Sequence, residues 1–323
     1  MLPDLLPIHP WTLLPDRIVG VDVLVWDEQA MTAIKCIDSR EQVTRSSFDQ
    51  IARGSGQKCY IENRNQSQYR RYLSESLESS EQPSAVPPLL RFTLLFESIR
   101  FQLLDGLGTC SLSKWVQCAY DATHQFFEKS NGMERLGKEI VSTFRKDGGF
   151  ATHAFNAGVY AYLIAKEMGL STLDQRECLT SGFLHDTGKL QLDPDYADQI
   201  EVPDGYMVVD SRQEQLAHCT AGFVFLSKIP SITRTPLLAC YQHHEYVNGM
   251  GFPVGLEGPD IPLTSKVCAL ANRWDGLLCD RKGRPGLSRI AAWKQLSSES
   301  GTLWDKELVS CLERLLNRPS RNY

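Results

Sequence analysis

The sequence predicts a mainly α-helical protein whose helical part is preceded by a small β-rich domain. Three observations lead to this fold class. Short runs rich in β-branched and aromatic residues occupy roughly the first 65 positions, and a polar segment rich in Ser, Glu and Gln follows them. From Leu89 onward, apolar residues recur at the spacing that places them on one side of a helix. At 323 residues, the chain is long enough for two domains.

The β-rich part is expected to contain three strands, at Ile18–Trp26, Met31–Ile37 and Lys58–Glu62. The polar segment from Gln66 to Pro88 ends in a proline-rich stretch that cannot continue a helix, so we interpret it as a linker. Residues 1–88 are therefore expected to form a small β-rich regulatory domain with a helical or polar linker. Residues 89–323 are expected to form the helical domain.

The helical part begins with a segment whose apolar residues share one helical face: Leu90, Phe92, Leu95, Ile99 and Leu103. Further helices are predicted at 112–129, 133–146, 151–168, 173–184, 212–228, 233–243, 263–279, 286–298 and 304–316. Most of these apolar stripes belong to an ordinary core. The helices within 89–130 also offer a surface for a homodimer, with burial inside the same chain as the alternative.

Composition narrows the classes of function. The formal net charge of −5 and the lack of a long basic run argue against DNA, RNA or a lipid surface as the partner. Ten scattered cysteines without a CxxC pair favour a reducing compartment over a disulfide framework. No stretch is apolar enough to span a membrane, and the first residues do not resemble a secretion signal. We therefore expect a soluble protein of the cytoplasm.

Histidines mark the candidate site. Five of the seven histidines lie between positions 153 and 244, as His153, the doublet His185-Asp186, His218, and the run His243-His244-Glu245. A single histidine in an apolar setting is usually a hydrogen-bonded core residue. Several buried imidazoles with a carboxylate, however, would leave polar groups without partners unless they bind a cation. Imidazole and carboxylate without thiolate are typical of iron, manganese or zinc in an open, catalytic type of site. Cys219 and Cys268 are read as small core residues.

This ordered set of residues resembles the HD-GYP subgroup of the HD-domain phosphohydrolases. The resemblance runs from His153 through His185-Asp186-Thr187-Gly188-Lys189 and His218 to His243-His244-Glu245 and Gly249-Met250-Gly251-Phe252-Pro253. It continues through the following loop as far as Leu263, and the whole region of interest extends from 149 to 285. An HD doublet alone would be weak support, whereas the complete order of motifs is specific.

The resemblance implies a site for two divalent metal ions, iron or manganese. His153, His185, Asp186 and residue 272 would bind one ion, while Asp186 would bridge to a second ion bound by His218, His243 and His244. It also implies cyclic di-GMP as the ligand, hydrolysed to pGpG or to GMP. Two such ions would activate a bridging water and stabilise the charge that develops on the phosphodiester.

Other residues are implied as contacts of the ligand. Lys189 would neutralise a phosphate oxygen, with a plain surface lysine as the alternative. Gly249, Gly251, Phe252 and Pro253 would form a loop beside the ligand, since the glycines allow tight turns. Arg281 and Arg284 match by spacing two arginines of the family, and guanidinium groups suit phosphate oxygens and guanine edges. A solvated basic loop is the alternative for these two arginines.

The chain departs from the family pattern at four positions. Asn272 stands where an aspartate normally binds the first metal, so that metal should bind more weakly, unless Asp275 on the same helical face takes part instead. Phe252 replaces the usual tyrosine, so its side chain has no hydroxyl group, and Asn248 replaces the usual aspartate just before Gly249. Gly149 stands where some members have a glutamate for a third metal, which predicts two metals here.

Three functions are compatible with these residues. The first is a cyclic di-GMP phosphodiesterase regulated by its N-terminal domain, with reduced activity if the substitutions matter. The second is a weak or inactive relative that senses cyclic di-GMP and passes the signal to a partner protein. Asn272 and Phe252 favour this second function, and the complete set of histidines favours the first. A hydrolase of mononucleotides shares the metal ligands but does not explain the Gly249–Pro253 loop.

Overall fold

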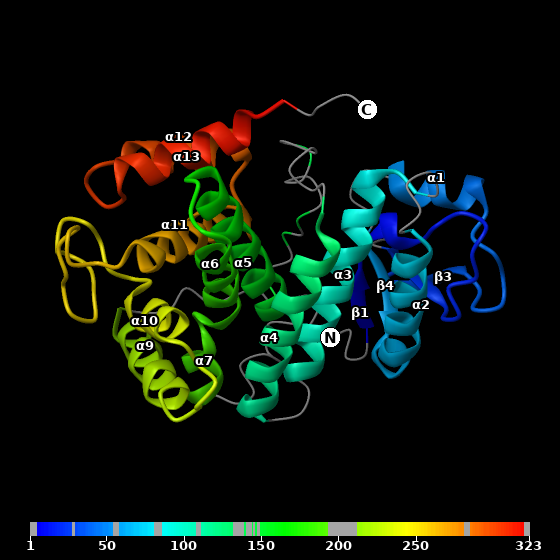
Figure 1. Cartoon of the computed structure of the whole chain (residues 1–323). Coiled ribbons are helices and arrows are strands. Elements are labelled where there is room, and N and C mark those ends of the chain that lie inside the picture. The colour runs from blue at the N-terminus through cyan, green and yellow to red at the C-terminus, as the bar shows by residue number, and fades with distance from the viewer. Residues whose placement is uncertain are drawn as a thin grey trace.

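Figure 1 shows the computed structural model of the chain, in which helices make up most of the molecule and a small sheet lies at one end. The structure describes residues 5–319 except for the gaps 28–29, 54–57, 81–85, 108–110, 132–138, 140–143, 145, 147–148, 193–211 and 281–284. The predicted fold class, mainly helical with a small β-rich N-terminal part, is confirmed.

The N-terminal sheet contains four antiparallel strands in the order β1-β4-β2-β3. Their bounds are Leu5–Ile8 (β1), Val23–Asp27 (β2), Thr32–Ile37 (β3) and Cys59–Glu62 (β4). The last three agree with the predicted strands, although β2 begins five residues later than expected. The sequence did not indicate β1, which contains Pro7. A proline is tolerated there because β1 lies at the edge of the sheet.

Two helices accompany this sheet. Helix α1 spans Arg45–Arg53, within the region expected to hold only strands, and α2 spans Gln66–Ser79, in the first half of the segment interpreted as a linker. Helix α2 buries Tyr69 and Leu73, and the hydroxyl of Tyr72 donates to the carbonyl of Thr12 at 2.6 Å. This polar segment thus packs against the N-terminal part of the chain.

Helix α3, Pro88–Leu107, lies between the N-terminal part and the other helices (Figure 1). Proline is well suited to the first turn of a helix, because the amide hydrogen that it lacks would have no partner there. Phe92, Leu95, Ile99 and Leu103 are all buried, as the periodicity predicted. Helix α4, Leu112–Lys129, packs along α3 and is capped by Ser111, which accepts from the amide of Lys114.

The remaining helices surround the histidines. Their bounds are Phe150–Glu167 (α5), Thr172–Leu184 (α6), Thr187–Leu192 (α7), Arg212–Leu226 (α9), Arg234–Gln242 (α10), Leu263–Leu278 (α11), Arg289–Ser298 (α12) and Lys306–Asn317 (α13). All but α7 match predicted helices to within about three residues. The helix predicted at 133–146 lies largely outside the described residues. Among the described helices, none is long and apolar enough to span a bilayer.

Candidate metal centre

Glycines bring the histidine-bearing helices close together. A side chain at Gly182 of α6 would overlap the backbone of Gly158 in α5, so this crossing brings His185, at the end of α6, near His153 of α5. A side chain at Gly188 would likewise overlap the carbonyl of His218. The absence of a Cβ is therefore what allows α7 to lie directly against α9.

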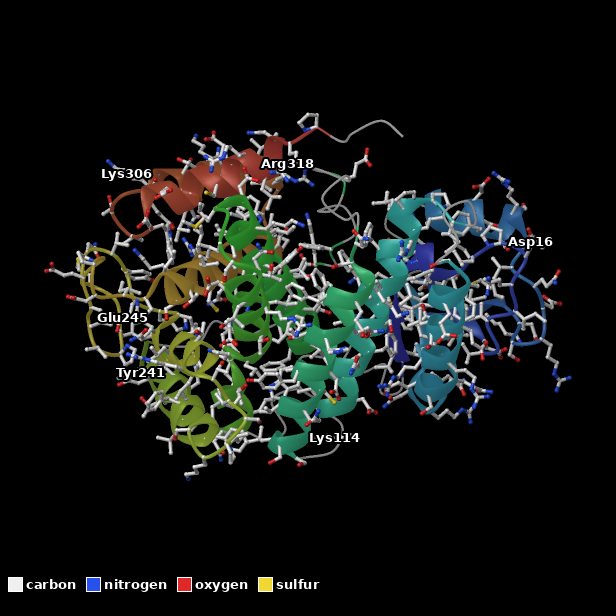
Figure 2. All side chains as sticks on the ribbon, viewed as in Figure 1. Asp16, Lys114, Tyr241, Glu245, Lys306 and Arg318 are labelled. Atoms are coloured by element: carbon white, nitrogen blue, oxygen red, sulfur yellow. The ribbon has the colours of Figure 1, made fainter. Side chains whose placement is uncertain are left out.

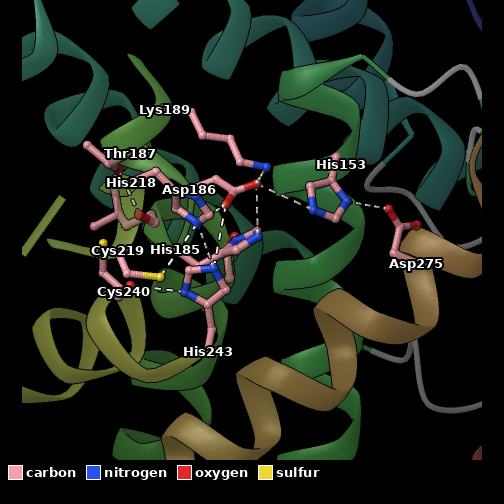
Figure 3. Close-up of polar contacts among 12 residues, drawn as sticks. His153, His185, Asp186, Thr187, Lys189, His218, Cys219, Cys240, His243 and Asp275 are labelled. Atoms are coloured by element: carbon pink, nitrogen blue, oxygen red, sulfur yellow. Dashed lines mark hydrogen bonds and ion pairs between the residues drawn. The ribbon is translucent and has the colours of Figure 1, made fainter. Parts of the chain in front are cut away.

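Asp186 lies at the centre of the histidines. Its Oδ2 atom is 3.4 Å from Nε2 of His185 and 3.8 Å from Nε2 of His153. Its Oδ1 atom is 3.3 Å from Nε2 of His218 and 3.6 Å from Nε2 of His243. The two carboxylate oxygens thus face two different groups of imidazoles, as Figure 3 shows.

Lys189 is the cation of this cluster. Its Nζ atom lies 3.0 Å from Oδ2 of Asp186, and its side chain is only 10% exposed. This placement excludes a plain surface lysine. Burial opposes ionisation of Asp186, but the attraction of His185 and Lys189 outweighs it and holds the pKa of this carboxyl well below its usual range. Asp186 is consequently an anion at neutral pH.

Backbone carbonyls fix two of the rings. Nδ1 of His185 donates to the carbonyl of Gly182 at 2.8 Å, and Nδ1 of His243 donates to that of Cys240 at 3.0 Å. In each case the bond fixes the tautomer, so that Nε2 offers a lone pair toward Asp186. Metal-binding histidines in proteins are commonly held in this way.

The first group consists of His153, His185 and Asp186, whose ligand atoms lie within 4.8 Å of one another. Nδ1 of His153 donates to Oδ2 of Asp275 at 2.7 Å, which directs Nε2 of His153 toward Asp186 (Figure 3). Asp275 is 2% exposed and also accepts from the side-chain amide of Asn156 at 2.8 Å. Asp275 therefore lies behind His153, on the far side of the ring from Asp186.

Asn272, the other residue considered for this group, is half-buried. Within the described part of the chain, its side chain makes no hydrogen bond to the histidines or to Asp186. The structure thus brings Asp275, and not Asn272, into hydrogen-bonded contact with a histidine of the first group.

The second group consists of His218, His243 and His244, together with Cys219. Nε2 atoms of His218 and His243 lie 3.2 Å apart, and Sγ of Cys219 is 3.7 Å from the same His218 nitrogen. Burial raises the pKa of the Cys219 thiol well above its usual range, which favours the neutral form. Sequence reasoning assigned Cys219 to the core and did not foresee its position beside the imidazoles.

The electrostatic state of the histidines suits cation binding. Burial lowers the pKa of His153, His218, His243 and His244, because an imidazolium would lose its hydration. Among the described residues, Nε2 of His153 and Nε2 of His185 are buried without a hydrogen-bond partner. Imidazole nitrogens gathered around one carboxylate fit divalent cations, which would satisfy the two unpartnered Nε2 atoms.

Glu245 shapes the loop that follows the second group, and Figure 2 places it where α10 leads into this loop. It is 3% exposed, and its carboxylate accepts from the backbone amides of Val254 at 2.7 Å, Leu256 at 3.0 Å and Gly255 at 3.1 Å. The sequence analysis did not predict that Glu245 binds these loop amides, although an acidic residue beside two histidines indicated a role at the site. Glu245 thereby fixes the path of the loop.

The same loop places an aromatic ring on the second group. The ring of Phe252 stacks on that of His244, with centroids 4.8 Å apart and planes inclined by 22°. Gly251 lies so close to the backbone of Glu245 and Tyr246 that a side chain would overlap it, and Gly249 has a φ of +74°, which favours glycine. Pro253 is half-buried, whereas Arg281 and Arg284 lie outside the described residues.

A model of the HD-domain family matches residues 143–308. The chain is 28% identical over 204 residues to the cyclic di-GMP phosphodiesterase response regulator RpfG of Xanthomonas campestris, covering 61% of this chain and 53% of that protein. It is 29% identical over 229 residues to a cyclic di-GMP phosphodiesterase of Thermotoga maritima, covering 70% of this chain and 61% of the relative. The chain thus spans between half and about three fifths of the length of these relatives.

A solved structure shares the whole architecture. It is Bd1817, an HDG"Y"P protein from Bdellovibrio bacteriovorus, which matches with a TM-score of 0.67 over 97% of this chain and 99% of that one. The two sequences are 17% identical. The similarity therefore establishes a common fold.

Proposed function

Because this chain belongs to the HD-domain family, we propose that it is a metal-dependent phosphodiesterase that hydrolyses cyclic di-GMP to pGpG, and further to GMP. The observation that carries the proposal is the position of Asp186, whose two oxygens face separate groups of imidazoles. A carboxylate with this arrangement can bridge two cations. The named activity of the Xanthomonas and Thermotoga relatives supports the choice of ligand.

We assign two divalent ions, iron or manganese, to the site. The first would be held by His153, His185 and Asp186, and the second by Asp186, His218, His243 and His244. Two such ions supply an activated water and an electrostatic clamp for the phosphodiester oxygens. Imidazole and carboxylate ligands favour iron and manganese over metals that prefer thiolate ligands.

Side chains of the protein position the ligand at the site. Asp186 remains an anion and lies between the two histidine groups. Lys189, next to it, offers an ammonium group for a phosphate oxygen. Phe252 lies flat on His244 and presents an apolar face beside the second group, without a hydroxyl group. Gly249, Gly251 and Pro253 set the loop in place, and we assign guanine or phosphate contacts to Arg281 and Arg284.

The experiment is a direct assay of turnover. Protein purified without chelator would be loaded with Mn²⁺ or Fe²⁺ and incubated with cyclic di-GMP, and pGpG and GMP would be followed by chromatography. We expect product with either metal and none after chelation. Unchanged cyclic di-GMP under all metal conditions would contradict the proposal.

A sensor of cyclic di-GMP is the second candidate function. It is favoured by Asn272, a neutral amide at the position where the resemblance expects a carboxylate, because loss of that charge weakens metal binding. In that case the protein would pass the signal to a partner protein or act as a homodimer. Metal-dependent binding of cyclic di-GMP without product in the same assay would support this alternative.

We further propose that the N-terminal part is regulatory and that the protein acts in the cytoplasm. The nine cysteines within the described residues are all free, and eight of them are buried. Free thiols in this number are typical of a reducing compartment. Mass spectrometry of the protein alkylated directly from cells would show these thiols unpaired.

A further inference from the structure

A buried ion pair lies where the N-terminal sheet meets helix α3. Arg100 and Glu97 are 2% and 3% exposed, and Nε of Arg100 donates to Oε2 of Glu97 at 2.8 Å. The Nη2 atom of Arg100 donates to the carbonyl of Pro7 in β1 at 2.7 Å. Burying two charges costs several kcal/mol per ion, roughly, before their attraction is counted. Stability alone is therefore a weak explanation for charged groups at this contact.

A small cavity lies between this ion pair and helix α5. Its walls include Arg100 and Glu97 of α3, Thr152 and Asn156 of α5, and His9 of the N-terminal part. About 10 Å³ is open to the centre of a water molecule, which is room for one water. In the described part of the chain, Nη1 of Arg100 and Oγ1 of Thr152 are buried and have no hydrogen-bond partner. One water could bond to both atoms.

From this cavity, polar contacts lead to the metal centre. Asn156, on the cavity wall, donates its side-chain amide to Oδ1 of Asp275 at 2.8 Å. The other oxygen of Asp275 accepts from Nδ1 of His153 at 2.7 Å. Partners of this kind orient a metal-binding histidine and increase its basicity. The orientation of His153 thus depends on Asp275, which is itself held by Asn156.

We propose that a water molecule in the cavity connects Nη1 of Arg100 to Oγ1 of Thr152 in α5. We infer that the connection from Pro7 through Arg100, the turn of α5 that carries Thr152 and Asn156, and Asp275 sets the metal affinity of the first group. The inference rests on the metal-binding part of the proposed function. It gives the N-terminal sheet a means of control, because a shift of β1 would move the guanidinium group. That movement would change how firmly Asp275 holds His153.

The test is a calorimetric titration of the metal-free full chain with Mn²⁺. Arg100→Met keeps an unbranched apolar stem but removes the guanidinium group and its hydrogen bonds. We expect it to weaken Mn²⁺ binding by about 10-fold, as loss of an outer partner of a metal ligand does. Tyr72→Phe is the matched control, since it removes buried hydrogen bonds to Thr12 and Leu14 in the N-terminal part without touching the cavity. It should leave the affinity unchanged.

A double variant separates the connection from general destabilisation. If Arg100 acts through Asn156, then Arg100→Met should have little further effect in an Asn156→Ala background. Equal effects in both backgrounds, or an unchanged affinity in folded Arg100→Met, would overturn the inference. Should Arg100→Met fail to fold, the same Mn²⁺ titration of Thr152→Val tests the inference. This variant removes the cavity hydroxyl at almost constant volume. Unchanged affinity in that variant overturns the inference, whereas a wild-type chain that binds no Mn²⁺ overturns the proposed function as well.

Discussion

The two histidine groups share one carboxylate but have different surroundings. In the first group, His153 is held from behind by the carboxylate of Asp275. In the second, His243 is held by backbone carbonyls and His244 is covered by the ring of Phe252. A carboxylate partner increases the basicity of an imidazole more than a carbonyl does. We therefore expect the two groups to bind metal with different affinities while depending on the same Asp186.

Loss of the shared carboxylate should weaken metal binding at both histidine groups. Asp186→Asn keeps the shape of the side chain but removes the charge that faces His153, His185, His218 and His243. We expect metal content to fall at both groups and kcat/KM for cyclic di-GMP to drop more than about 100-fold, beyond the effect of outer-shell partners. Metal analysis and the chromatographic assay measure these changes. Asp121→Asn on the exposed face of α4 is the control, and retention of both metals in Asp186→Asn would refute the bridging role.

Removal of the metals should destabilise the whole helical part, since both groups join several helices. With free Mn²⁺ at about 1,000 times its Kd, binding adds about 4 kcal/mol to the free energy of unfolding. A chelator should therefore lower the Tm measured by calorimetry. An unchanged Tm would show that the histidines hold no metal.

The metal-free protein should also lose stability in acid. Burial lowers the pKa of His153, His218, His243 and His244 in the folded chain, whereas in the unfolded chain they titrate near pH 6.5, roughly. Below that pH the unfolded chain binds more protons than the folded chain. The free energy of unfolding should therefore be highest above about pH 6.5 and decrease as the pH falls below it. Chemical unfolding of the metal-free protein across this range measures the effect.

Local patterns in the sequence predicted most of this molecule. Apolar periodicity identified α3, and the order of motifs identified the histidines that gather around Asp186. The contacts between distant segments could not be predicted in this way. Asp275 meets His153 across 122 positions and Arg100 meets Pro7 across 93, because the packing of α11 on α5 and of α3 on β1 brings them together. The helix α2 was interpreted as a linker because its polar composition hid the buried face of Tyr69 and Leu73.

Asn272→Asp tests whether the missing carboxylate at position 272 makes the first group the weaker one, in spite of the support that Asp275 gives to His153. The new carboxylate would add a charged oxygen at the position where the HD-GYP pattern has a metal-binding aspartate. We expect the affinity for the more weakly bound Mn²⁺ to rise by about 10-fold, with the tighter binding step unchanged. Calorimetric titration separates the two steps, and Asn248→Asp in the exposed loop is the control for added charge. An unchanged weaker step would show that residue 272 does not reach the metal.

Phe252→Tyr tests the second group and should have the smallest effect. The ring of Phe252 already stacks on His244, so a tyrosine would keep this contact and add a hydroxyl group at its edge. A new hydrogen bond to a phosphate oxygen is worth about 1 kcal/mol, or about five-fold in kcat/KM for cyclic di-GMP. Because the hydroxyl group would not bind metal, Mn²⁺ affinity should not change. Phe223→Tyr, in α9 where the ring contacts Tyr241, controls for the added oxygen. A gain in Mn²⁺ affinity without a gain in kcat/KM would place the ring against the metal and not against the ligand.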